Sequence, residues 1–174
     1  MAVPAAAAHA FVTDLDAPDL RPDDEHHLFR ALRLRPGEAV TVSDGAGRWR
    51  RCTVGARGLE PAGDVVVEPR SEPPIAVAFA LTKGERPEWV VQKLTELGVD
   101  EIRPMTTRHT VVRWDHGRRA KAMARLREVA RSAAMQARLA WLPAIGEPCG
   151  FDDALAAFGA GRVAVAHPGG QLVS

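Results

Sequence analysis

The sequence has few cysteines, few aromatic residues and no long hydrophobic run. Among its 174 residues, Cys52 and Cys149 are the two cysteines, and they give neither a metal-ligand spacing nor a disulfide framework. No run of eighteen apolar residues is present, so no segment is expected to span a membrane. The first twelve residues lack the basic region and the long apolar run of a signal peptide. These absences predict a cytoplasmic protein with reduced thiols.

Signature motifs of several enzyme classes are also missing. The sequence contains no GxxxxGK followed by Ser or Thr, and no GxGxxG after a predicted strand, so neither a P-loop nor a dinucleotide fingerprint is present. It has no HExxH motif and no pair of CxxC motifs, so no metal site is expected. A GxSxG elbow is absent as well. Common nucleotide-binding, zinc-dependent and serine hydrolase classes are therefore not supported.

Positive charge is concentrated in the middle of a nearly neutral chain. The formal net charge is +1, yet residues 101–141 hold ten arginines or lysines against three acidic residues. Such an excess is typical of a surface that binds a polyanion. It is also typical of a solvated helix face, and the sequence leaves both interpretations open.

The first seventy residues predict a small β-barrel domain. Strands are expected at 9–13, 39–43, 48–56 and 65–68, and the glycines of 44–47 are typical of a hairpin turn. One helix is expected at 22–34, with Arg35-Pro36-Gly37 as its stop. Three prolines within 68–74 disfavour regular structure and predict a linker to a second domain.

After the linker the pattern alternates between strands and helices. Strands are expected at 75–81, 102–106 and 162–166, and helices at 87–97, 116–139 and 151–158. The apolar run 75–81 is typical of a buried parallel strand. The expected apolar face of the first helix is Trp89, Val90, Leu94 and Leu97, and that of the second is Ala120, Met123, Ala124, Leu126, Ala130, Ala133 and Ala134. This α/β pattern predicts a mainly parallel sheet over 75–174 with helices on both faces.

Polar side chains near the strand ends are candidate ligand groups, because ligands of such sheets bind beyond the carboxyl ends of the strands. Each has an alternative structural role, as a solvated or helix-capping residue. The candidates comprise loop and helix cations, one amide, and a His-Pro-Gly-Gly turn: Arg30, Arg33, Arg35, Lys83, Arg86, Arg108, Gln136, Arg138, His167, Pro168, Gly169 and Gly170.

Three stretches together resemble one family, the bacterial 16S rRNA uridine N3-methyltransferases of the SPOUT superfamily. HHLFRALRLRPGEAVTVSDGAGRWRRCTV resembles the family's N-terminal PUA-like RNA-binding barrel, and LTKGERPEWVVQKLTELGVDEIRPMTTRHTVV resembles the opening of its catalytic domain. RSAAMQARLAWLPAI is similar to the family's Glu-Ala-x-x-Gln-x-x-Arg segment, with Ser132-Ala133 in place of Glu-Ala and shortened spacing.

The resemblance implies a PUA-like β-barrel over 1–70 and a SPOUT-type α/β domain of the trefoil-knot class over 75–174. It implies a homodimer that binds S-adenosylmethionine and methylates uridine N3 in the 16S rRNA of the small ribosomal subunit. Catalytic roles would fall on Arg108, Arg138 and Gln136, and cofactor binding on 167–170. Contacts to RNA would come from basic side chains, namely Arg30, Arg33, Arg35, Lys83 and Arg86.

Two segments of the family pattern are absent, a Gly-Pro-Glu-Gly-Gly stretch and a later stretch ending in Glu-Thr-Ala. We therefore expect a partial domain, truncated before the knot and without most of the cofactor loops. One alternative is a non-catalytic RNA-binding protein that uses the barrel and the basic helix 116–139. Another is an α/β enzyme for a small anionic substrate, with Lys83 and Arg108 at the strand ends.

We predict that the 174-residue chain binds S-adenosylmethionine weakly and is inactive by itself, because only 167–170 of the expected cofactor loops lie within it. Isothermal titration calorimetry of the chain with S-adenosylmethionine should detect no tight binding. Tight binding by this form would contradict the expectation of a partial pocket.

Overall fold

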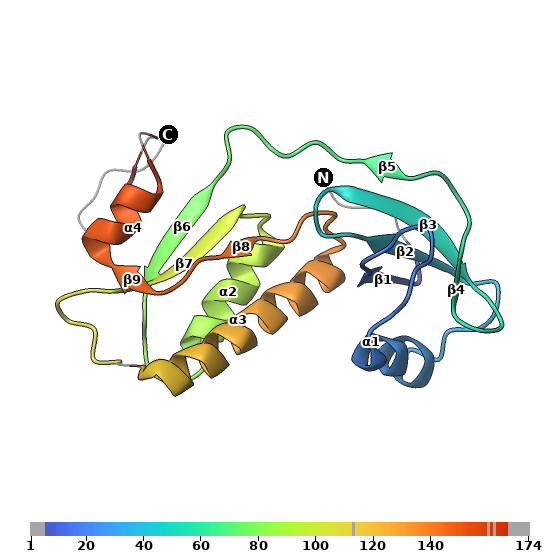
Figure 1. Ribbon diagram of the computed structural model, residues 1–174, viewed down its shortest axis with the longest axis horizontal. Helices are drawn as coiled ribbons and strands as arrows, with labels where there is room; N and C mark the ends of the chain where they lie inside the picture. The colour runs from blue at the N-terminus through green and yellow to red at the C-terminus, as the bar shows by residue number, and fades with distance from the viewer. Residues whose placement is uncertain (1–5, 113, 160, 162, 167–174) are drawn as a thin grey trace.

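The computed structural model describes residues 6–112, 114–159, 161 and 163–166, which form two sheets joined by an extended segment (Figure 1). The first sheet has five strands: β1 (Ala8–Phe11), β2 (Ala39–Ser43), β3 (Arg48–Val54), β4 (Leu59–Pro61) and β5 (Val66–Val67). The second sheet has four: β6 (Ala76–Ala80), β7 (Glu101–Thr106), β8 (Ala144–Ile145) and β9 (Cys149–Gly150). The change from one sheet to the other follows β5, near the predicted linker.

The first sheet is built around the predicted hairpin of β2 and β3. The two strands are antiparallel, and the Asp44 carboxylate accepts hydrogen bonds from the backbone N–H of Ala46 (2.8 Å) and Arg48 (3.1 Å). Gly45 has a φ of 74°, which glycine adopts without steric cost. β1 pairs in parallel with β2, and the described strands form an open path from β1 to β4, with β5 beside β3. A closed barrel was expected, whereas the described strands form an open sheet.

The predicted helix 22–34 is shorter and less regular than expected. It consists of α1 (Pro22–His26) followed by η1 (His27–Ala31), a turn of π-helix. Arg33 then adopts the left-handed conformation, with a φ of 55°, which ends the helix before Arg35-Pro36-Gly37. Leu28 from η1 is fully buried and packs with Val40 and Cys52 in the core of this unit.

The second sheet is parallel, as predicted, and β7 lies at its centre. β6 pairs with one side of β7, while β8 and β9 pair with the other. Helices α2 (Arg86–Glu96) and α3 (His116–Ala137) pack together on one face, where Val91, Ile102 and Met123 form the core. Helix α4 (Phe151–Ala157) lies beyond β6 and β9, on the side away from α2 and α3 (Figure 1).

Two expectations about burial were wrong. Strand β6 is at most half-buried, because it is an edge strand and the helices cover one of its faces. On α2 the buried stripe is Pro87, Val91 and Thr95, spaced four residues apart toward α3. Trp89 and Leu97 from the expected apolar face are 61% and 79% exposed. On α3, Ala120 and Ala124 are likewise exposed, whereas the other five expected apolar residues are buried.

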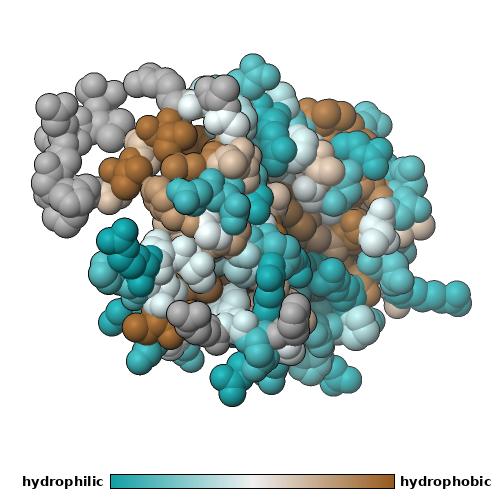
Figure 2. Space-filling view, turned by 60° about the vertical axis from the view of Figure 1, so that its left-hand side comes forward, coloured by the Kyte–Doolittle hydropathy of each residue, from teal (hydrophilic) through white to brown (hydrophobic). Residues whose placement is uncertain are grey.

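The expected third strand at 162–166 does not form in residues 163–166, which the structure describes as irregular. Val163 and Val165 are 51% and 67% exposed, and Phe151 at the start of α4 is 39% exposed. Figure 2 shows this side of the molecule, where apolar surface gathers among hydrophilic residues. Strands β8 and β9 take the place next to β7 instead. Each has two residues and follows a proline, so neither gives a recognisable apolar run.

The segment after α3 attaches the two units to each other. Leu142 donates its backbone N–H to Gly45 (2.9 Å), and the Trp141 indole N–H donates to the carbonyl of Glu68 (3.0 Å). The Trp141 ring lies against Gly47, where a Cβ would overlap the ring. Arg70, within the predicted linker, lies over Trp141 and pairs with Asp100 (2.7 Å). The predicted linker is therefore held against both units.

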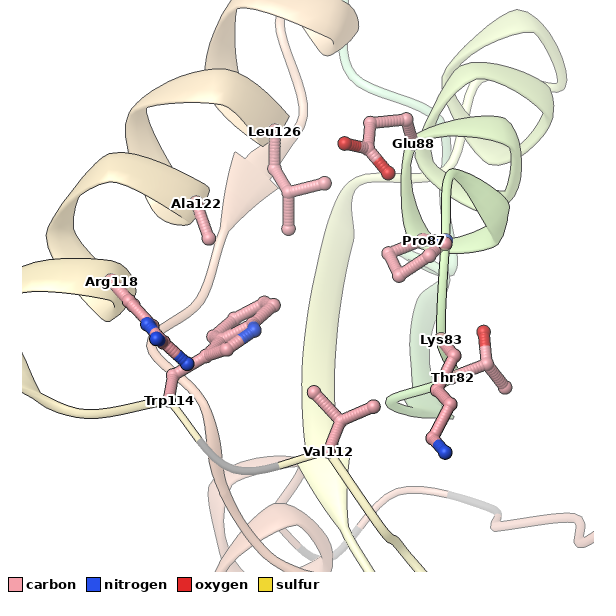
Figure 3. Close-up of a pocket in the computed structure, with 10 residues that line it drawn as sticks. Thr82, Lys83, Pro87, Glu88, Val112, Trp114, Arg118, Ala122 and Leu126 are labelled. Atoms are coloured by element: carbon pink, nitrogen blue, oxygen red, sulfur yellow. The ribbon is translucent and has the colours of Figure 1, made fainter.

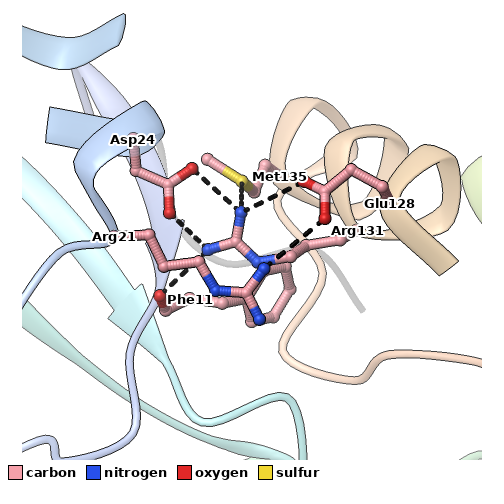
Figure 4. A network of polar contacts seen from close by, with 6 residues as sticks. All are labelled: Phe11, Arg21, Asp24, Glu128, Arg131 and Met135. Atoms are coloured by element: carbon pink, nitrogen blue, oxygen red, sulfur yellow. Dashed lines mark hydrogen bonds and ion pairs between the residues drawn. The ribbon is translucent and has the colours of Figure 1, made fainter. Parts of the chain in front are cut away.

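A buried ion pair forms a second attachment (Figure 4). Arg131 of α3 donates to both carboxylate oxygens of Asp24 in α1, with Nη1 2.9 Å from Oδ1. Both residues are 6% exposed. Arg131 Nη2 also donates to the carbonyl of Phe11 (3.2 Å), and Glu128 lies nearby, paired at the surface with Arg21. Two-pronged pairs of this kind fix orientation as well as distance.

We predict that Arg131→Met lowers the free energy of unfolding by roughly 3–5 kcal/mol, because it leaves the Asp24 carboxylate buried without its partner. Urea denaturation followed by circular dichroism measures the loss. The matched control is Arg21→Ala, whose exposed pair with Glu128 should contribute no more than about 1 kcal/mol. Equal losses in the two variants would show that the buried pair does not hold the units together.

Candidate functional site

Basic loops and two cavities lie at the carboxyl edge of the parallel sheet. Residues 81–86 follow β6, and residues 107–115 follow β7. Between the start of α2 and the start of α3 lies a cavity of about 450 Å³ (Figure 3). A second cavity, of about 490 Å³, lies between the end of β6 and β9 and is lined by Thr106, Cys149 and Arg119 among others. This edge is where the sequence analysis placed a ligand.

Arg108 projects from a tight turn directly after β7. Thr107 and Thr110 close this turn, since the N–H of Thr110 donates to the carbonyl of Thr107 (3.0 Å) and the N–H of Thr107 donates to Thr110 Oγ1 (2.8 Å). Arg108 is exposed and has no ion-pair partner in the part of the chain that the structure describes. Its guanidinium is therefore available to an anionic ligand.

Lys83 and Arg86 lie at the same edge, in the loop between β6 and α2. Gly84 has a φ of 73°, which lets the loop turn sharply after Lys83. Lys83 lines the cavity between α2 and α3, whereas Arg86 is the first residue of α2 and points to solvent. The structure thus brings Lys83, Arg86 and Arg108 to one edge, as their positions after β6 and β7 predict.

Arg138 and Gln136 lie at the opposite edge of the sheet. Helix α3 has 22 residues, about 33 Å of helix, and it runs back from the carboxyl edge. Arg138 caps its end in the left-handed conformation, with a φ of 55°, and donates to the carbonyl of Ala6 (2.6 Å). Gln136 is exposed. Within one chain, the three candidate catalytic residues therefore do not meet at one point.

His9 is a buried titratable group beside Arg138. Its Nε2 lies 3.1 Å from the carbonyl of Leu139, so the proton of the neutral ring is on Nε2, and Nδ1 accepts from Thr41 Oγ1 (2.9 Å). Burial lowers the pKa of His9 from 6.5 to about 4, with a smaller lowering by the positive charge of Arg138. His9 therefore stays neutral at physiological pH and belongs to the contact between β1 and the segment after α3.

Arg30, Arg33 and Arg35 lie at the end of η1 and in the loop that follows it. All three are exposed, and Arg30 and Arg33 have no ion-pair partner among the described residues. The Glu38 carboxylate accepts the backbone N–H of Arg35 (2.7 Å), which shapes the loop and leaves the Arg35 side chain outward. Their exposure suits contacts to phosphate groups.

Part of the positive charge in 101–141 is neutralised inside the molecule. Glu147 pairs with Arg119 (3.1 Å) and Arg127 (2.8 Å), and Arg103 pairs with Glu101 (2.5 Å). The hydrogen bond from Arg127 lowers the pKa of Glu147. Glu147 lies outside the segment whose charges were counted, so the sequence could not reveal this pairing. Lys121 and Arg125 on α3 remain exposed without an acidic partner in the described part of the chain.

The described residues contain neither a metal-binding cluster nor a membrane-spanning helix. No group of three or more histidine, cysteine, aspartate or glutamate side chains there is arranged to hold a metal ion. Within the same residues, no helix combines the length and the apolar character needed to cross a membrane. The expected cofactor residues His167, Pro168, Gly169 and Gly170 lie outside the described residues.

Comparison with protein families identifies the two halves of the chain. A model described as "RNA methyltransferase PUA domain" matches residues 20–60, and one described as "RNA methyltransferase domain" matches residues 69–173. The second match covers more than half of the chain, and the chain belongs to the RNA methyltransferase family. The family resemblance expected from the sequence is confirmed.

Curated relatives carry the name ribosomal RNA small subunit methyltransferase E. The protein from Mycobacterium tuberculosis is 36% identical over 127 residues, covering 71% of this chain and 48% of the relative. The protein from Synechocystis is 31% identical over 129 residues, covering 72% of this chain and 41% of the relative. This chain thus spans about half the length of the curated relatives it matches.

Solved structures agree in fold. The ribosomal RNA small subunit methyltransferase E of Neisseria gonorrhoeae, bound to S-adenosyl methionine, has a TM-score of 0.64 at 26% identity, over 85% of this chain and 64% of that one. A putative methyltransferase from Legionella pneumophila in complex with the same cofactor has a TM-score of 0.71 at 26% identity, over 84% of this chain and 64% of that one.

We predict that the free energy of unfolding falls as the pH is lowered from about 6.5 to about 4, by at most about 3 kcal/mol from His9. Because its folded pKa is below its unfolded value, the unfolded chain binds a proton in this window that the folded chain does not. Urea denaturation at several pH values, with His9→Asn as the comparison, isolates the contribution. Parallel curves for the two proteins would contradict it.

Proposed function

We propose that this chain is part of an enzyme that transfers a methyl group from S-adenosylmethionine to N3 of a uridine in 16S rRNA. The observation that carries the proposal is the match of the RNA methyltransferase domain to residues 69–173. The names of the curated relatives support the rRNA substrate, and the cofactor bound in two similar solved structures supports the methyl donor. The basic carboxyl edge of the second sheet supports an anionic partner.

Uridine N3 carries a proton that must leave as the methyl group is transferred. Negative charge then develops over N3 and the two neighbouring carbonyl oxygens of uracil. A cation fixed near those oxygens stabilises this charge, and correct alignment of N3 with the donor accounts for much of the remaining acceleration. The protein therefore needs a free cationic donor where the base is held.

We assign this role to Arg108 in preference to Arg138. Arg108 is exposed at the carboxyl edge, within the Thr107–Thr110 turn that fixes its backbone. Arg138 already donates to the carbonyl of Ala6 and lies at the opposite edge with Gln136. In this proposal Arg138 and Gln136 serve a uridine only if a second subunit places its own carboxyl edge beside them, as a homodimer would allow.

The PUA-like unit, residues 1–70, is proposed to hold rRNA by phosphate contacts from Arg30, Arg33 and Arg35, and the unit 75–174 to hold the reacting base. Such contacts are independent of sequence and depend strongly on salt. The predicted SPOUT-type knot, the homodimer and the cytoplasmic location belong to the same proposal.

The described residues by themselves do not fit S-adenosylmethionine. The cofactor carries a sulfonium cation, whereas the linings of the two described cavities at the carboxyl edge hold three cations, Lys83, Arg118 and Arg119, against one acidic residue, Glu88. The donor supplies the methyl group in this proposal, and the described residues bind and orient the RNA and stabilise its charge.

We predict that small ribosomal subunits from a strain lacking the gene gain one methyl group on a uridine when treated with the complete gene product and S-adenosylmethionine. Mass spectrometry of nuclease fragments detects the added methyl, and reverse transcription stops at the site because N3 is on the pairing edge. Arg108→Ala should lower kcat at least tenfold with little change in KM.

The control for this variant is Arg57→Ala, an exposed arginine in the loop after β3, which should leave kcat unchanged. Binding of RNA without methylation by the complete protein would favour the alternative of a non-catalytic RNA-binding protein. An Arg108→Ala enzyme with normal kcat would move the charge-stabilising role to Arg138 or elsewhere.

A further inference from the structure

We propose that the cleft between the starts of α2 and α3 is a subsite for one unstacked base of single-stranded RNA, with the Trp114 indole as its stacking platform. This inference rests on the proposed function, since it assigns a place to the RNA beyond the reacting uridine. Among the residues that line the cleft, Lys83 is the one that the sequence indicated as a candidate ligand group.

The cleft has the shape and lining that a base requires. Its volume is about 450 Å³, and its apolar wall comes from Trp114, Pro87, Val112 and Leu126. Figure 3 shows Trp114 on the α3 side of the opening, with Pro87 across from it on the α2 side. Trp114 packs partly against the core formed by α2, α3 and β7, so the platform is held in place while part of it remains open.

Cations surround the opening of the cleft. Lys83 and Arg118 line it from opposite sides, and the Arg118 side chain is 77% exposed. Lys121 lies three residues after Arg118, and Arg125 lies four residues after Lys121, so the three cations share one face of α3. Among the described residues, the ion-pair partner of Arg118 is Asp115 at 3.5 Å, and this exposed pair has little strength. This arrangement gives an RNA backbone a row of cations that begins at the cleft.

Glu88 is the acidic residue among those lining the cleft. Figure 3 shows its carboxylate at the end of the cleft away from Lys83. A carboxylate there disfavours a phosphate group inside the cleft but accepts hydrogen bonds from the N–H groups of a base. The charges therefore place the base inside and the phosphates at the rim.

The partner that fits these features is single-stranded RNA rather than duplex RNA. Proteins bind unpaired nucleotides by combining a cationic path for the backbone with aromatic side chains on which bases stack. In a duplex the faces of the bases are already stacked on each other and cannot enter the cleft. Small anions would use Lys83 and Arg118 but have no need of the indole.

The test is the affinity of the 174-residue chain for a dye-labelled single-stranded 12-nucleotide RNA, measured by fluorescence anisotropy. Trp114→Leu should weaken this binding about tenfold or more, and Trp114→Phe should retain most of it, because phenylalanine still offers a ring for stacking. Neither change should alter the affinity of the chain for inorganic polyphosphate, because polyphosphate has no bases. Lys83→Gln and Arg118→Gln should each weaken the binding of both ligands. Each should also reduce the slope of log affinity for RNA against log salt concentration by about one.

The matched control is Trp89→Leu, since Trp89 is 61% exposed on α2 and does not line the cleft. It should bind the 12-nucleotide RNA like the wild type. Thermal unfolding of each variant verifies that the chain is folded, and Trp114→Phe keeps the test valid if Trp114→Leu is unstable.

Equal RNA affinity in folded Trp114→Leu and wild type would overturn the subsite and leave the proposed methylation standing. Preference for a duplex of the same sequence would overturn it as well. If the complete protein does not methylate rRNA but Trp114→Leu still weakens RNA binding, the proposed function is rejected and the subsite is supported.

Discussion

The buried pair of Arg131 and Asp24 is the interaction on which the arrangement of the two units depends. A charge at this depth is tolerated only with a partner, and the partners come from positions 107 residues apart in the sequence. Arg131 lies on α3, which also forms the core of the second sheet with Met123 and Leu126. Helix α3 therefore both fixes the orientation of the first unit and forms part of the core of the second.

The same helix sets the geometry of the site. Because α3 starts at the carboxyl edge and ends at the amino edge, its two ends present different chemistry. Its start adjoins Trp114 and Arg118 at the cleft, while its end places Arg138 against Ala6 and His9. Helix α3 runs from the carboxyl edge toward the first unit (Figure 1), and Lys121 and Arg125 are exposed along it.

Much of the fold follows from local patterns in the sequence. The hairpin at 44–47, the parallel pairing of β6 with β7, and the extent of α3 were predicted because turn glycines, apolar runs and helical periodicity are short-range signals. Strands β8 and β9 were missed because a strand of two residues is too short to show a periodic hydrophobic pattern. The strand expected at 162–166 does not form in residues 163–166, which are irregular and exposed.

The site was predicted less completely, for a physical reason. Lys83 and Arg108 follow strands, so their common edge is implied by topology alone. The contacts of Trp114, Arg131 and His9 join segments far apart in the chain, and no local pattern marks them. Pairing of Glu147 with Arg119 and Arg127 likewise depends on the fold, and it removes part of the charge excess on which the expectation of a polyanion was based.

The contact of Gly47 with Trp141 has a consequence for the evolution of this junction. The indole occupies the space that any side chain at position 47 would need, and Gly47 has a φ of 89° that favours glycine in any case. A larger residue at 47 is therefore compatible with this junction only if position 141 becomes smaller and the hairpin changes its turn. The two positions are expected to change together among descendants of this chain.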